Sequence, residues 1–212
     1  MRYFLISLSP DSASPVNNGE PLKIIAILQS RMGSSRLPNK ALLKLNGKPA
    51  ILRMTDRIKE SKTIKEIWLA TGKAKINNKL ESLFSNTKIK VFRGDDNDVL
   101  SRFALAAEYT TAKVLVRITG DCPLLDPGLL EEMINEFHDQ ESDYFSNCIS
   151  PTYPDGLDVE IFTRNVLLLA QAECIDAAQR EHVTPWMRES GRFRLAQKRH
   201  NVDHSAARWT VD

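Results

Sequence analysis

The sequence predicts an α/β protein with a mainly parallel sheet flanked by helices and a mixed-sheet second half. Apolar runs of strand length alternate with amphipathic segments four times between residues 23 and 138, which is the pattern of a parallel sheet with right-handed crossovers. The opening run, residues 23–29 (KIIAILQ), holds five consecutive apolar residues, as expected of a strand buried on both faces.

Each element of the first half has its own local signal. Pro49 stands near the first turn of one predicted helix, and Asp98 can cap another through its side chain. The strands are expected at residues 23–29, 66–71, 89–92 and 113–118. The helices are expected at residues 49–61, 77–85, 98–109 and 127–138.

After Glu141 the alternation breaks down, and this change predicts the mixed part of the sheet. Strands are expected at residues 143–146, 157–162, 193–197 and 206–211, with helices near residues 163–178 and 181–189. Residues 1–21 are rich in Ser, Pro, Asn and Gly toward their end, which predicts a loosely ordered extension. Residues 22–212 are expected to form one domain.

Composition excludes several classes of function. The 212 residues include 29 Lys and Arg against 27 Asp and Glu, a net charge of +2, which favours no nucleic-acid partner. No apolar run is long enough for a transmembrane helix, so no membrane partner is expected. Three cysteines without CxxC spacing argue against a zinc cage or a disulfide framework and indicate a cytoplasmic protein.

The segment after the first strand, residues 30–40 (SRMGSSRLPNK), is the first candidate site. Ligands of open α/β sheets bind beyond the carboxyl ends of the strands. Arg31, Arg36 and Lys40 could supply positive charge to a triphosphate, Ser34 could donate to its oxygens, and Gly33 would allow close approach of the backbone. GxGxxG and GxxxxGK[ST] are both absent, so this is neither a dinucleotide-binding nor a P-loop motif. A solvated basic loop is the alternative.

Asp121 follows the fourth predicted strand and would face the same crevice. Magnesium takes one or two protein carboxylates and fills its remaining positions with waters and substrate phosphates. A carboxylate at a strand end is enough to begin such a site. The alternative is a turn residue within Gly-Asp-Cys-Pro. Arg93 could reach a nucleotide from the third strand, although a packing role is equally compatible with its position.

The second half holds candidates for a second substrate. Asp158 and Glu160 alternate with apolar residues, which would place both carboxylates on one strand face, and Tyr153 and Asp155 precede them. These side chains could border a sugar pocket, or simply belong to a half-exposed edge strand. The residues expected to open the following helix are Arg180, Glu181 and His182, of which the arginine suits a sugar carboxylate.

Six segments together resemble the sugar cytidylyltransferases, most closely the family of spore coat polysaccharide biosynthesis protein F, related to the CMP-KDO and CMP-sialate synthetases. They are residues 25–40 (IAILQSRMGSSRLPNK), 92–102 (FRGDDNDVLSR), 116–126 (VRITGDCPLLD), 153–161 (YPDGLDVEI), 180–185 (REHVTP) and 208–212 (RWTVD). The resemblance implies a GT-A-like nucleotide-diphospho-sugar transferase fold.

The resemblance also implies a reaction and its participants. CTP and an acidic sugar would give a CMP-sugar and pyrophosphate for surface polysaccharide or glycan biosynthesis, with Mg²⁺ held by Asp121 and Asp212. Nucleotide contacts would include Met32 and the loop residues above, with Arg31 and Lys40 on the departing pyrophosphate. Residues 140–200 would contribute the sugar-binding segment and the contact of a homodimer.

Two other functions fit parts of the pattern. A nucleotide-sugar glycosyltransferase on the same fold usually offers an Asp-x-Asp pair, but Pro123 stands two residues after Asp121. A non-catalytic nucleotide or sugar binder is the other alternative, because family members continue past the position of Asp212 and this chain is expected to be shortened there.

Overall fold

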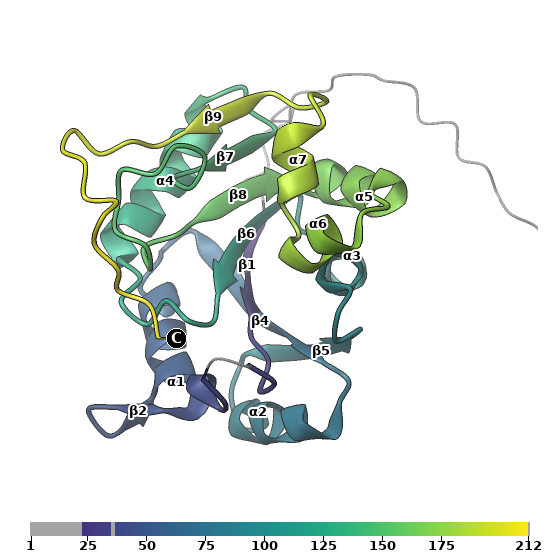
Figure 1. Ribbon diagram of the computed structural model, residues 1–212, viewed down its shortest axis with the longest axis vertical. Helices are drawn as coiled ribbons and strands as arrows, with labels where there is room; N and C mark the ends of the chain where they lie inside the picture. The colour runs from purple at the N-terminus through teal and green to yellow at the C-terminus, as the bar shows by residue number, and fades with distance from the viewer. Residues whose placement is uncertain (1–22, 35–36, 212) are drawn as a thin grey trace, which may run out of the picture.

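The computed structural model describes residues 23–34 and 37–211 (Figure 1). Its strands are β1 (Ile24–Gln29), β2 (Lys44–Leu45), β3 (Lys48–Pro49), β4 (Ile64–Gly72), β5 (Lys90–Gly94), β6 (Val114–Thr119), β7 (Tyr144–Ser146), β8 (Glu160–Thr163) and β9 (Leu195–Gln197). Its helices are α1 (Ala50–Lys59), α2 (Asn78–Phe84), α3 (Val99–Glu108), α4 (Pro127–Asp139), α5 (Arg164–Glu173), α6 (Ala177–His182) and α7 (Pro185–Glu189). Short 3-10 turns, η1 (Lys40–Leu42) and η2 (Lys75–Asn77), complete the elements. The extension predicted at residues 1–21, and the predicted site residues Arg36 and Asp212, lie outside the described residues.

Seven strands form one sheet in the order β5-β4-β1-β6-β8-β7-β9. The first four are mutually parallel. Strand β8 runs antiparallel to its neighbours β6 and β7, and β9 is parallel to β7. A mainly parallel sheet with a mixed second half is therefore confirmed. The carboxyl ends of β1, β4, β5 and β6 meet at one edge, where the predicted loop and Asp121 lie.

Helices cover both faces of the sheet, as Figure 1 shows. Alternate side chains of β1 point to opposite faces. Ile24, Ala26 and Leu28 pack in one core with residues of α1, α2 and α4, whereas Ile25 and Ile27 pack in a second core with α3 and α5. All five side chains are fully buried. The continuous apolar run of β1 therefore reflects a strand covered on both faces, as predicted.

Local signals placed the helices of the first half well. The Asp98 carboxylate accepts a hydrogen bond from the Ser101 N–H at 2.9 Å, so the predicted cap of α3 is confirmed. The hairpin of β2 and β3 was not predicted. Its turn residues, Asn46 and Gly47, both have positive φ, at 49° and 80°, and Asn-Gly is the pair that two-residue hairpin turns favour. That pair was the signal for the hairpin.

The second half departs from prediction at two strands. Strand β8 begins at Glu160 rather than at residue 157, because the Asn147 side chain bonds to the Leu157 carbonyl at 2.8 Å and the Val159 N–H at 2.9 Å. Those backbone groups are therefore satisfied outside the strand ladder. The strand predicted at residues 206–211 is wrong: these residues are irregular and contribute one isolated bridge, between Asp155 and Arg208.

The helices of the second half are divided differently from the prediction. Helix α5 stops at Glu173, and the single helix expected at residues 181–189 is replaced by α6 and α7. The chain breaks between them at Val183, whose φ of 73° is incompatible with a continuing helix. Arg180, Glu181 and His182 therefore close a helix instead of opening one.

Within the described residues, no helix combines the length and apolar character needed to cross a membrane. The three cysteines are all free thiols, of which Cys122 and Cys174 are buried.

Candidate functional site

The loop after β1 is held in place by side chains from the neighbouring strand ends. The Met32 N–H donates to Asn77 Oδ1 at 2.8 Å, and the Asn77 amide donates to Asp96 Oδ1 at 3.1 Å. Met32 itself is buried, so this predicted nucleotide contact also anchors the loop. Ser34 Oγ accepts from the Leu37 N–H at 3.3 Å. The loop is therefore fixed at its base, and Gly33 is exposed.

Gly33 lies in the accessible part of that loop. A Cβ placed on this residue would meet no atom within 4 Å, and its φ is not positive, so neither packing nor backbone strain demands glycine here. The open space beside Gly33 is available to a ligand, which agrees with the predicted close approach of a ligand to this backbone.

Two predicted cations of the loop, Arg31 and Lys40, lie within the described residues, and both bond to acidic or carbonyl groups. Arg31 donates to the Asp96 carbonyl at 3.0 Å and pairs with Glu181 of α6 at 3.1 Å. Lys40 Nζ lies 2.8 Å from Asp121 Oδ2. The structure thus brings together four predicted site residues from distant parts of the sequence, Arg31 with Glu181 and Lys40 with Asp121.

Asp121 occupies the turn after β6, and Gly120 allows that turn to cross close to β1. The Gly120 N–H bonds to the Gln29 carbonyl at 2.7 Å, and any Cβ at this position would lie 2.7 Å from the same oxygen. Burial opposes ionisation of Asp121, but the hydrogen bond and charge of Lys40 outweigh it and lower the pKa of this carboxyl below its usual value. Asp121 is therefore a carboxylate at neutral pH.

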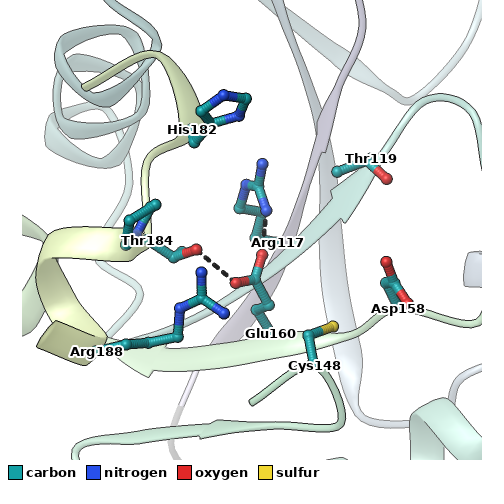
Figure 2. Close-up of a pocket in the computed structure, with 9 residues that line it drawn as sticks. Arg117, Thr119, Cys148, Asp158, Glu160, His182, Thr184 and Arg188 are labelled. Atoms are coloured by element: carbon teal, nitrogen blue, oxygen red, sulfur yellow. Dashed lines mark hydrogen bonds and ion pairs between the residues drawn. The ribbon is translucent and has the colours of Figure 1, made fainter. Parts of the chain in front are cut away.

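A cavity of about 370 Å³ opens beside this turn, between the sheet and α7. Figure 2 shows its lining side chains pointing inward from β6, β8, the α6–α7 junction and α7. The lining residues are Arg117, Thr119, Cys148, Asp158, Glu160, His182, Thr184, Pro185 and Arg188. Three of the predicted substrate-binding residues, Asp158, Glu160 and His182, thus share one cavity. We call this cavity the acceptor pocket.

Glu160 forms the floor of the acceptor pocket, and its carboxylate binds three other side chains. Its Oε1 accepts from the Tyr144 hydroxyl and the Thr184 hydroxyl, both at 2.6 Å, and its Oε2 pairs with Arg117 (Figure 2). Burial opposes ionisation, but the charge of Arg117 and these hydrogen bonds hold the pKa of Glu160 below its usual value. The Arg117 guanidinium also donates twice to Gln29 Oε1.

Asp158 lies at the opposite end of the pocket from Arg188, on the side of Thr119 (Figure 2). Burial, together with the charges of Asp155 and Glu160, raises the pKa of Asp158 to about 6. The same effects of burial and neighbouring carboxylates raise the pKa of Cys148 well above its usual value, so its thiol stays protonated. Asp158 is thus a comparatively basic carboxylate in this pocket.

Four predicted substrate residues lie outside the pocket lining: Tyr153, Asp155, Arg180 and Glu181. Asp155 faces Arg208 at 3.6 Å, and the Tyr153 ring packs edge-on against His200. Asp155 and Tyr153 thus lie with the C-terminal segment. Asp158 precedes β8, so Asp158 and Glu160 do not share a strand as predicted, although both line the pocket.

Two predicted arginines hold the fold together instead of facing open space. Arg180 bonds to the Asp98 carboxylate at 2.8 and 2.9 Å and to the Cys174 carbonyl at 2.7 Å. Its guanidinium joins α6 to the start of α3 and is not directed at a sugar carboxylate. Arg93 similarly bonds to carbonyls of residues 72–74 and to Glu81.

Six residues of the pocket lining were not predicted as site residues: Arg117, Thr119, Cys148, Thr184, Pro185 and Arg188. Arg117 had a visible signal, because it interrupts the apolar run of β6 and a charge within a buried strand needs a partner. Thr184 and Arg188 had none, since their roles depend on where the short helix α7 is placed.

Solved structures show the class of protein that this fold defines. A cytidylyltransferase from Leptospira borgpetersenii serovar Hardjo-bovis matches with a TM-score of 0.85 at 32% identity, covering 90% of this chain and 82% of that one. A CMP:2-keto-3-deoxy-manno-octonic acid synthetase complexed with CTP shares the fold, with a TM-score of 0.61 at 19% identity over 84% and 90% of the two chains. The fold is that of the nucleotidyltransferases.

Sequence comparison narrows this class. The sequence profile of the family described as cytidylyltransferase matches residues 25–207. An uncharacterized protein of Methanocaldococcus jannaschii is 39% identical over 171 residues, 80% of this chain and 68% of that protein. Spore coat polysaccharide biosynthesis protein SpsF of Bacillus subtilis is 32% identical over 197 residues, 85% and 81% of the two chains. The chain belongs to the cytidylyltransferase family and is a nucleotidyltransferase, which confirms the resemblance seen in its motifs.

Proposed function

We propose that this cytidylyltransferase joins CTP to the anomeric hydroxyl of an acidic sugar and releases pyrophosphate. The observation that carries the proposal is the Lys40–Asp121 pair, which stands at the strand ends beside a cavity of sugar size. The synthetase of an acidic sugar has the same fold. The relative named for spore coat polysaccharide supports assigning the product to polysaccharide or glycan synthesis.

The loop after β1 and Asp121 form the nucleotide side of the site. The triphosphate oxygens replace Glu181 and Asp121 as partners of Arg31 and Lys40, since phosphate offers both cations more charge than one carboxylate each. Ser34 and the open backbone at Gly33 approach the same oxygens. Arg36 is assigned to the same triphosphate.

Asp121 has the chemistry of a magnesium ligand. The described residues contain no group of three His, Cys, Asp or Glu side chains that could hold an ion without substrate. The Val211 N–H donates to the Asp121 carbonyl at 2.8 Å, so the residue that precedes Asp212 in the sequence lies beside Asp121. A carboxylate pair at that place fits Mg²⁺ that shares its coordination with phosphates, and we assign Asp121 and Asp212 to it. When bound, the ion neutralises charge on the reacting phosphates.

The acceptor pocket, or acceptor side, holds the sugar with its anomeric hydroxyl toward Thr119 and Asp121. The hydroxyl oxygen forms a bond to the α-phosphorus, and the bond from that phosphorus to the bridging oxygen of the pyrophosphate breaks. Asp158 accepts the hydroxyl proton, a role that its raised pKa of about 6 favours. Arg31 and Lys40 stay with the departing pyrophosphate. The acceleration comes mainly from positioning and electrostatics.

We further place the reaction in the cytoplasm, in keeping with three free thiols, and assign a homodimer whose contact includes part of residues 140–200. Strand β9 lies at the sheet edge with Leu195 40% exposed, and an open edge of this kind can pair with another chain. Light scattering of the purified protein measures the assembly, and a monomer at micromolar concentration contradicts this assignment.

The test of the reaction is pyrophosphate release from CTP, UTP, ATP and GTP, each with Mg²⁺ and a panel of acidic and neutral sugars. We expect release that requires both CTP and an acidic sugar, with the CMP-sugar identified by mass spectrometry. Equal rates with all four nucleotides, or release that needs no sugar, would contradict the proposal.

A further inference from the structure

Arg188 carries a positive charge in the acceptor pocket and lacks the partners that such a charge usually has. It lies on α7, and its guanidinium points into the pocket toward Glu160 and Arg117 (Figure 2). Its Nε is buried and has no hydrogen-bond partner among the described residues. No ion pair of the described residues involves it, whereas Arg31, Arg180 and Arg192 each pair with a carboxylate.

The nearby carboxylate of Glu160 is engaged by three other side chains and forms no ion pair with Arg188 among the described residues. The Tyr144 and Thr184 hydroxyls share Oε1, and Arg117 pairs with Oε2. Arg117 therefore balances the charge of Glu160 at close range, and Arg188 has no ion pair of its own among the described residues. Cys148 stays protonated and adds no negative charge. A buried donor without a partner is costly to keep, unless a ligand supplies the missing oxygens.

We propose that Arg188 binds the anionic group of the acceptor and thereby selects acidic sugars over neutral ones. This inference rests on the proposed function, since it takes the cavity to be the acceptor pocket. The ligand chemistry is an oxyanion, either carboxylate or phosphate, which the two edges of a guanidinium bind through paired hydrogen bonds. Arg188 takes the place that sequence analysis gave to Arg180, whose guanidinium is occupied by Asp98 and backbone carbonyls.

Asp158 at the other end of the pocket supports this orientation. A negative group near Asp158 would be repelled, while one near Arg188 is attracted, so the pocket is electrically polarised along its length. His182 lines the pocket near α7 and can donate to the same oxyanion. The acidic group therefore binds toward α7, and hydroxyl groups of the sugar lie toward Asp158.

Calorimetry of acceptor binding in the presence of Mg²⁺ and CMP tests the inference with sugars that differ in one group. Mannose, mannuronate and mannose 6-phosphate share a ring but carry a neutral, carboxylate or phosphate group, and 3-deoxy-manno-octulosonate carries its carboxylate on the anomeric carbon. In the wild-type protein we expect at least one anionic probe to bind more tightly than mannose. The tightest probe then identifies the oxyanion and its position.

Arg188→Gln should weaken binding of that probe by roughly 10- to 100-fold, the range for a hydrogen bond to a charged group, and should leave mannose unchanged. Arg188→Lys should recover part of the loss. The control, Arg192→Gln, removes an exposed charge paired with Glu173 and should bind like wild type. Because Arg188 has no ion pair among the described residues and its buried Nε has no partner there, the melting temperature of Arg188→Gln should be equal to or above that of wild type.

Two outcomes overturn the inference: equal binding of the anionic probe by wild type and Arg188→Gln, or no preference of the wild-type protein for any anionic probe over mannose. Both can occur in a protein that still makes a CMP-sugar, so they leave the proposed function standing. Conversely, an Arg188-dependent preference without pyrophosphate release in wild type would support the oxyanion site and reject cytidylyl transfer.

Discussion

On the nucleotide side, Lys40 and Asp121 are partly exposed, at 17% and 25% of their side-chain surface, and they bond chiefly to each other. On the acceptor side, Arg117 and Glu160 are only 11% and 7% exposed and share further bonds with neighbouring side chains. An accessible pair contributes about 0–1 kcal/mol, whereas losing one member of a buried pair costs about 3–5 kcal/mol. This difference supports the proposal that substrate exchanges with the first pair, whereas the second pair is part of the scaffold.

The same contrast predicts which charged residues affect ligand binding and which affect the stability of the fold. Charges that a ligand must displace are held loosely by one partner each, so substitutions there should change affinity or turnover more than stability. Charges that shape the pocket are held by several partners, so substitutions there should destabilise the fold. Four substitutions test this division, in order of decreasing expected effect.

Glu160→Gln should lower the free energy of unfolding by roughly 3–5 kcal/mol, because it leaves the Arg117 charge buried without its counter-ion. The lowered pKa of Glu160 means that its stabilisation is present above the unfolded pKa of about 4.5 and is lost in acid. Denaturant unfolding at pH 7 measures the effect. Glu173→Gln, at an exposed ion pair, is the control and should cost under about 1 kcal/mol. Equal stability of both variants would remove the contrast between the two sides.

Asp121→Asn should reduce turnover by roughly 10²–10³-fold, since it removes the charge expected to hold Mg²⁺ beside the triphosphate. Its free energy of unfolding should change by no more than about 1 kcal/mol, because the pair with Lys40 is partly exposed. Pyrophosphate release and thermal unfolding measure the two effects. Asp139→Asn, at the exposed end of α4, should be silent in both. Wild-type turnover in Asp121→Asn would reject the proposed mechanism.

Lys40→Ala should weaken CTP binding by about 1.5–3 kcal/mol, the range for a hydrogen bond to a charged group, with the fold intact. Thermal shift on addition of CTP and Mg²⁺ reports this loss, because a ligand that binds only the folded state raises its stability. Lys44→Ala removes an exposed lysine of β2 nearby and should shift like wild type. If Lys40→Ala also shifts like wild type, the loop lies outside the nucleotide site.

Asp158→Asn should raise stability above pH 6 by roughly 1–2 kcal/mol. The pKa of Asp158 in the folded protein is about 6 and exceeds the usual 3.8. Burial and the charges of Asp155, Glu160 and Asp121 raise this pKa, and a hydrogen bond from Cys148 lowers it by less. The protonated form is therefore favoured by folding, and the wild-type protein loses stability as pH rises from about 4 to 6. Melting temperatures of both proteins at pH 4 and 7.5 should coincide in acid and separate at neutral pH. A constant difference across this range would contradict the raised pKa.

The fold of the first half was predictable because its signals are local. The apolar run of β1, the Asp98 cap and Pro49 before α1 each act through near neighbours in the sequence, and all three lie where predicted. The second half was less predictable, because the Asn147 side chain bonds to backbone groups of Leu157 and Val159, ten or more residues later in the sequence. These bonds take the place of strand hydrogen bonds there. No local pattern at residue 157 reveals that substitution.

For the site, the sequence by itself determined the family, the loop after β1 and the carboxylate at the end of β6, because motif and strand order place them without knowledge of side-chain contacts. Only the tertiary structure decided which charges are available. Arg180 and Arg188 belong to neighbouring short helices, yet the first is bonded to Asp98 and the second enters the pocket without a partner. Electrostatic pairing depends on the distance between charged atoms. Arg117 and Glu160 are far apart in the sequence, and only the packing of the chain brings them together across the sheet.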